Sequence, residues 1–61
     1  MNIEFLERLT TMEAAELKTL YHKTLNELHD ATMASNWEVV DAKEPGFNKI
    51  IEEMEKRGMA R

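Results

Sequence analysis

The sequence contains no cysteine, one proline and only two glycines among its 61 residues. Without cysteine the chain has no disulfide bond, no thiolate metal site and no cysteine nucleophile. The two glycines do not form a glycine-rich loop of the kind that cradles a phosphate group. No apolar run approaches the about 20 residues that cross a bilayer, and the first residues lack the pattern of a signal peptide. We therefore expect no membrane partner and a cytoplasmic location.

The charge balance is acidic, with 12 Asp and Glu residues against 8 Lys and Arg and a formal net charge of −4. This excess disfavours binding to a phosphate backbone, so a basic protein surface is a more natural partner than nucleic acid. Hydrophobic content of 43% and charged content of 33% are typical of a folded domain. A domain this small buries only about 60% of the surface that its unfolded chain exposes, so its stability is marginal. Because disulfides are excluded, we expect oligomerisation or partner binding to supply the missing stability.

Large apolar residues recur at spacings of three and four in the first half of the chain, which is the period of one helix face. They are Leu17, Leu20, Tyr21, Leu25 and Leu28. Thr10, followed three residues later by Glu13, matches a capping box, and Thr11 is the alternative cap. The pattern predicts a long helix over residues 11–42.

Two alternatives stay open at the end of this helix. Ser35 and Glu38 match a second capping box, which favours a break near residue 36. Residues 37–40 also resemble a short extended piece, because they include aromatic and β-branched side chains.

Shorter elements are predicted on both sides of the long helix. Apolar residues at helical spacing predict a short helix over residues 3–9. Pro45 followed by glycine fits the centre of a type II turn over residues 43–46. A third helix is predicted over residues 47–57, with Gly58 in the left-handed position that ends it.

Together these elements predict an all-α fold, either a small helical hairpin or a three-helix unit with one long central helix. We expect a single α-helical domain over residues 1–61. The large apolar side chains exceed what two or three short helices can bury. We therefore expect the unit to be completed by oligomerisation, most simply as a homo-oligomer.

No residue pattern predicts catalysis. His22 and His29 lie seven residues apart, so on one helix their side chains stand about 10.5 Å apart and cannot share one metal ion. No serine lies in a nucleophile elbow, and the paired carboxylates lie on faces expected to be wet. The sequence therefore predicts a protein that is not an enzyme, with no catalytic residue, no metal site and no cofactor.

The remaining hypotheses concern binding. Trp37 is either a lid on the hydrophobic core, which is somewhat favoured, or an exposed anchor for a partner. The leading hypothesis is a small acidic module that binds another protein as an inhibitor, adaptor or assembly factor. Its candidate contact residues are Trp37, Val40, Phe47 and Tyr21. The alternative is an oligomer that sequesters a small anionic ligand, such as a nucleotide, at a subunit interface. Its candidate residues are His22, Lys23, Lys56 and Arg57.

Overall fold

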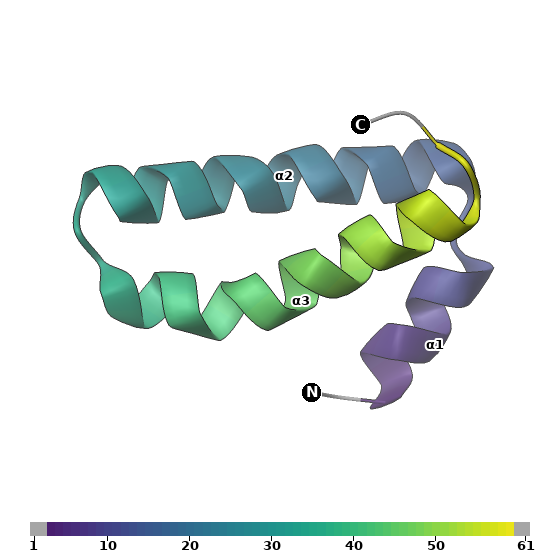
Figure 1. Cartoon of the computed structure of the whole chain (residues 1–61), viewed down its shortest axis with the longest axis horizontal. Coiled ribbons are helices and arrows are strands. Elements are labelled where there is room, and N and C mark those ends of the chain that lie inside the picture. The colour runs from purple at the N-terminus through teal and green to yellow at the C-terminus, as the bar shows by residue number, and fades with distance from the viewer. Residues whose placement is uncertain (1–2, 60–61) are drawn as a thin grey trace.

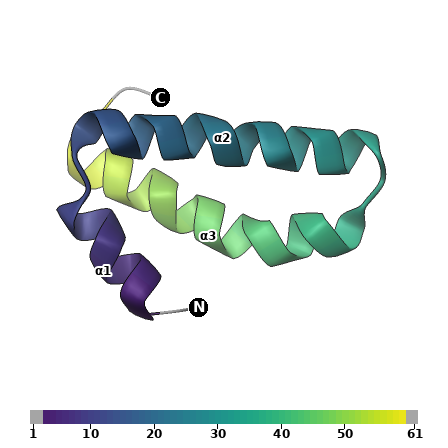
Figure 2. The same cartoon turned by 180° about the vertical axis from the view of Figure 1, so that it is seen from behind.

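The computed structural model describes residues 3–59, which form three helices and no strand: α1 (Ile3–Thr11), α2 (Ala14–Met33) and α3 (Trp37–Lys56). The predicted all-α fold is confirmed. α2 and α3 run antiparallel as a hairpin, and α1 lies at its open end, beside the C-terminal half of α3 (Figure 1, Figure 2). α2 and α3 each contain 20 residues, so two equal helices replace the predicted single long central helix. Residues 1, 2, 60 and 61 of the predicted domain lie outside the described residues.

The hairpin turn explains why α2 stops short of the predicted end at residue 42. The N–H of Ser35 donates to the carbonyl of Thr32 at 3.0 Å, and the N–H of Asn36 donates to the carbonyl of Ala31 at 2.7 Å. These two bonds form a Schellman motif with Ser35 in the left-handed conformation, φ 56°. The helix predicted over residues 11–42 is therefore broken near residue 36, as the capping-box alternative allowed, and its two parts meet at this turn.

α3 begins immediately after the turn. The side chain of Asn36 accepts a hydrogen bond from the N–H of Val39 at 3.4 Å, so Asn36 caps the helix in place of Ser35. Residues 37–42 are helical, and the extended alternative is wrong. The chain has already reversed direction at residue 36, so it returns along α2 as a helix.

The predicted turn at residues 43–46 does not form, because Pro45 lies inside α3. A proline in a helix interior lacks the N–H that would bond to the carbonyl four residues earlier, and it costs about 3 kcal/mol. α3 changes direction near its middle (Figure 1), as proline kinks do. The apolar stripe of α3 continues on both sides of Pro45. Burial of this stripe against α2 outweighs the local preference for a turn, and the predicted helix over residues 47–57 is the second half of α3.

The junction between α1 and α2 also differs from the prediction. α1 continues to Thr11 rather than ending at residue 9, and the Thr10 hydroxyl donates back to the carbonyl of Glu7 at 2.7 Å. Glu13 precedes α2 in an extended conformation and makes no side-chain capping bond. The expected capping box is therefore absent, since the Thr10 hydroxyl bonds within its own helix.

The core lies at the open end of the hairpin, where all three helices meet. Leu9 of α1, Leu17 of α2, and Ile50 and Met54 of α3 are buried and form one cluster. Phe5, Met12, Leu20, Tyr21 and Met59 pack around it. The other buried apolar residue among residues 3–59 is Ala31, close to the turn. The large buried side chains are thus concentrated at one end of the molecule.

The C-terminal end of α3 closes onto this core. Gly58 adopts a left-handed conformation with φ 70°, and the N–H of Met59 donates to the carbonyl of Met54 at 2.9 Å. Glycine suits this position because it has no β-carbon to clash. The motif turns the Met59 side chain onto the cluster and fixes the end of the helix beside α1.

Candidate functional site

The side of the hairpin away from α1 carries an aromatic pair. The rings of Tyr21 on α2 and Phe47 on α3 are stacked, with centroids 5.4 Å apart and planes inclined by 20°. Both side chains are only partly buried. Because this contact joins the two helices, it fixes which residues before and after it share the same side of the hairpin.

Apolar residues extend from this pair along both helices at helical spacing. On α2, Leu25 and Leu28 follow Tyr21 at four and seven residues. On α3, Val40 and Ile51 flank Phe47 at seven and four residues. None of the six side chains is fully buried, and Leu25 is 39% exposed. We call this surface the α2–α3 face and define it by Tyr21, Leu25, Leu28, Val40, Phe47 and Ile51.

α1 occupies the opposite flank of α3. A β-carbon placed at Gly46 would lie 3.8 Å from two atoms of the Phe5 ring, which is an ordinary contact distance. Lys49 and Glu53 follow Gly46 at three and seven residues, and they line a groove together with Leu6 and other residues of α1. Phe47 is turned about 100° away from Gly46 on the helix. The α2–α3 face is therefore left uncovered by α1.

Toward the turn, the side of the hairpin that carries α1 is polar. The ammonium group of Lys43 contacts a carboxylate oxygen of Glu27 at 2.6 Å, which links α3 to α2. The hydrogen bond from Lys43, helped by the positive charge of Lys43, lowers the pKa of Glu27. Glu27 lies two residues from Leu25, about 200° around the helix, and so points to the other side. Toward the turn, the two sides of the hairpin thus differ, because an ion pair joins the helices on one side and Leu25 lies on the other.

The structure brings three of the four predicted contact residues together. Tyr21, Val40 and Phe47 lie on the α2–α3 face, and Trp37 stands at its edge, three residues before Val40. Trp37 is 58% exposed, so the favoured interpretation of this residue as a lid on the core is wrong. It is the first residue of α3, where the helix has only begun to pack against α2. Leu25 and Ile51 were not predicted as contact residues. Their positions, four residues after Tyr21 and Phe47, are the sequence signal that could have identified them.

The predicted anion-binding residues are not gathered in the same way. His22 and Lys23 are exposed near the middle of α2, and the His22 ring meets the edge of Tyr21 with centroids 5.2 Å apart. Lys56 and Arg57 are at the end of α3. Lys23 and Lys56 line different grooves.

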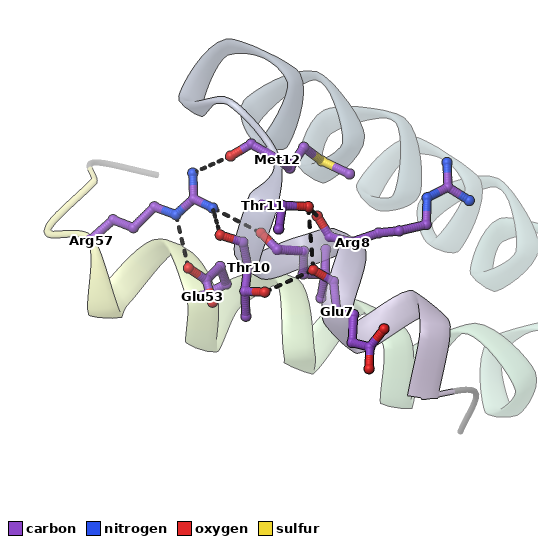
Figure 3. Close-up of polar contacts among 8 residues, drawn as sticks. Glu7, Arg8, Thr10, Thr11, Met12, Glu53 and Arg57 are labelled. Carbon is purple, nitrogen blue, oxygen red and sulfur yellow. Dashed lines mark hydrogen bonds and ion pairs between the residues drawn. The ribbon is translucent and has the colours of Figure 1, made fainter.

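Arg57 has a structural role that the sequence did not predict. Its Nε donates to the carboxylate of Glu53 at 2.8 Å, and its Nη1 donates to the carbonyl of Met12 at 2.6 Å (Figure 3). Its Nη2 donates to the carbonyls of Leu9 at 2.8 Å and Thr10 at 3.3 Å. The guanidinium group therefore caps the carbonyl end of α1, where a helix dipole favours a positive charge.

The described residues offer no further site chemistry. No three His, Asp or Glu side chains within residues 3–59 are grouped as metal ligands would be, and no buried side-chain nitrogen or oxygen in this range lacks a hydrogen bond. None of the helices in this range has the length and apolar character needed to cross a membrane. Besides the groove between α1 and α3 and a second groove lined by Met12, Ala15 and Leu20, the α2–α3 face is a candidate functional surface. Comparison of the chain with known protein families, with characterised proteins and with solved structures finds no match.

Proposed function

We propose that the protein acts by binding another protein chain through the α2–α3 face, as an inhibitor, adaptor or assembly factor, and not by catalysis. The observation that carries this proposal is the continuous row of partly exposed apolar side chains on the side of the hairpin that α1 leaves open. Tyrosine is enriched among the residues that supply most of the binding energy at protein interfaces, and the buried centre of an interface is more apolar than the rest of a protein surface.

The contrast between the two sides of the hairpin supports the proposal. Toward the turn, on the side of the hairpin that carries α1, the Lys43–Glu27 ion pair makes the surface polar. On the α2–α3 face, the contact between the two helices is the stacked Tyr21–Phe47 pair, and the His22 ring meets the edge of Tyr21. Leu25, which is 39% exposed, contributes less to the fold of a single hairpin than a buried leucine would, whereas a partner would remove it from water.

The anion-binding alternative receives less support. Of its four candidate residues, Arg57 directs its guanidinium group to three backbone carbonyls and to Glu53. Because these contacts hold α1 against α3, an anion at Arg57 would have to compete with the fold.

Site-specific photo-cross-linking in the cells that produce the protein tests the proposal. A photoreactive phenylalanine analogue is placed at Leu25, on the α2–α3 face, or at Met33, which is 75% exposed at the end of α2 and outside the face. We expect the Leu25 position to form a discrete covalent adduct with a protein chain and the Met33 position to form none. Equal labelling at the two positions, or no adduct at either, would contradict the proposal.

A further inference from the structure

Charged groups on the α2–α3 face are divided between the two helices. Along α2, Lys18 and Thr32 flank Leu25 at intervals of seven residues, and His22 and His29 lie just outside this row. Seven residues are about two helical turns, so Lys18, Leu25 and Thr32 share one flank. The α2 side of the face therefore carries no carboxylate among these residues and has positive or neutral groups only.

The α3 side has the opposite charge. Trp37, Glu44 and Ile51 recur every seven residues, and Asp41 and Glu55 lie just outside this row. All of these side chains except Ile51 are exposed, and none is positively charged. The face thus presents an apolar centre between an α2 border whose formal positive charge is Lys18 and an α3 border that carries the carboxylates of Asp41, Glu44 and Glu55.

Such a face is complementary to a copy of itself. When a two-fold axis runs along the hairpin, α2 of one copy lies against α3 of the other, and the acidic border of each α3 meets an α2 border that carries no carboxylate among these residues. When the axis runs across the hairpin, α2 meets α2 and α3 meets α3, so that the acidic borders of the two α3 helices approach each other. Like charges brought together at an interface are unfavourable, and the first arrangement avoids them.

We propose that the occupant of the α2–α3 face is a second copy of this chain, related by a two-fold axis parallel to the helices, so that two hairpins form a four-helix core. The inference rests on the proposed binding function of the same face and identifies the partner. Antiparallel contact between α2 of one copy and α3 of the other is the usual geometry of helix bundles. Near the turn, the buried apolar residue among residues 3–59 is the small Ala31. A second copy would add apolar contacts to the α2–α3 face in this part of the hairpin.

The residue pairs that lie opposite each other on α2 and α3 within one hairpin give the register of the dimer. Tyr21 lies level with Phe47, and Glu27 lies level with Lys43. By the same antiparallel spacing, Leu25 lies level with Glu44. The axis along the hairpin keeps these levels, so Leu25 faces the region of Glu44 in the second copy.

The oligomeric state is tested by sedimentation equilibrium and light scattering over a wide range of concentrations. We expect the wild-type protein to have the mass of two chains. Leu25→Glu, which places a charge on the apolar face, is expected to reduce the mass to one chain while the helical circular dichroism is retained. Met33→Glu adds the same charge outside the face and is the matched control, expected to remain a dimer.

The orientation is tested by disulfide trapping. Because the sequence has no cysteine, any disulfide must involve the introduced residues. Purified Leu25→Cys and Glu44→Cys proteins are oxidised separately and as an equal mixture. The proposed axis predicts a mixed disulfide between the two variants and little disulfide in either variant alone. A disulfide dimer of Leu25→Cys alone, with no mixed product, would overturn the proposed axis.

A wild-type monomer at every concentration, or equal effects of Leu25→Glu and Met33→Glu, would overturn the self-association. This outcome is distinguishable from failure of the proposed function. If the purified protein is a monomer and the Leu25 cross-link in cells joins a different protein, the second copy is excluded and the binding function stands. If no adduct forms at Leu25, both fail.

Discussion

Replacing Arg57 by methionine removes the guanidinium group that joins α3 to the end of α1 and keeps an unbranched side chain. The wild-type side chain makes three hydrogen bonds of 2.6–2.8 Å, to the carboxylate of Glu53 and to the carbonyls of Met12 and Leu9. Its own side chain is 23% exposed and that of Glu53 is 12% exposed, so these bonds are partly shielded from water. We expect this variant to be strongly destabilised.

The magnitude follows from two opposing effects. Hydrogen bonds that involve a charged group contribute about 1.5–3 kcal/mol each. Against this, water replaces part of the lost bonding, and the released side chain regains up to about 2 kcal/mol of conformational entropy. The net loss expected for Arg57→Met is about 2–4 kcal/mol, against a total of about 3–9 kcal/mol for a domain of this length. The corresponding fall in Tm is roughly 10–25 °C.

The assay is thermal and urea unfolding followed by circular dichroism. Lys56→Met removes a neighbouring exposed charge and is the matched control, expected to change the free energy of unfolding by less than about 1 kcal/mol. Arg57→Lys retains the charge without the planar fork and is expected to lie between the two. If Arg57→Met and Lys56→Met were equally stable, the assignment of Arg57 as the link between α1 and α3 would be refuted.

Three further predictions concern the hairpin. Ser35→Gly is expected to stabilise the protein by about 0.5–1 kcal/mol, because glycine accepts the left-handed conformation without strain; urea unfolding checks this, and a loss of stability would contradict it. Pro45→Ala is expected to raise Tm, since it restores a hydrogen bond inside α3 and removes a penalty of about 3 kcal/mol; a lower Tm would mean that the bend at Pro45 supports packing worth more than the penalty. Lys43→Met is expected to raise the pKa of Glu27, which the hydrogen bond from Lys43 lowers in the wild type, as measured by NMR titration of the carboxyl carbon. A carboxyl group whose pKa is lowered by folding stabilises the folded state at pH values above its pKa in the unfolded chain. This stabilisation is lost as the pH falls through the pKa of the folded state, so the wild type should lose it on acidification and Lys43→Met should not. An unchanged Glu27 titration would rule out the ion pair in solution.

The apolar spacing in the sequence was sufficient to predict an all-α fold and the helical identity of both arms of the hairpin. It left open a break near residue 36 but placed the reversal of the chain at residues 43–46. The Pro45–Gly46 pair is the strongest local turn signal, whereas the true turn at Ser35 uses a residue that seldom adopts a left-handed conformation. The continuation of α3 through Pro45 depends on packing against α2, which is a long-range interaction. Local preference and tertiary burial opposed each other there, and burial prevailed.

The candidate surface was only partly predictable for a related reason. Tyr21, Val40 and Phe47 could be chosen from the sequence because they are large and apolar, but their assembly on one face depends on the hairpin register that the Tyr21–Phe47 contact sets. Arg57 was misassigned because its partners are carbonyl groups of the main chain, 45 and 48 residues away in the sequence at Met12 and Leu9. No side-chain pattern marks such partners.

The claim that a second copy covers the α2–α3 face is tested most directly by methyl NMR of the purified protein with a soluble gadolinium chelate, at low and high protein concentration. In the single chain Leu25 is 39% exposed and Ile3 is 70% exposed, so the chelate reaches both at low concentration. As the concentration rises, we predict that broadening of the Leu25 methyl signals decreases while that of the Ile3 signals is unchanged. Broadening of Leu25 and Ile3 in the same ratio at every concentration would contradict the account.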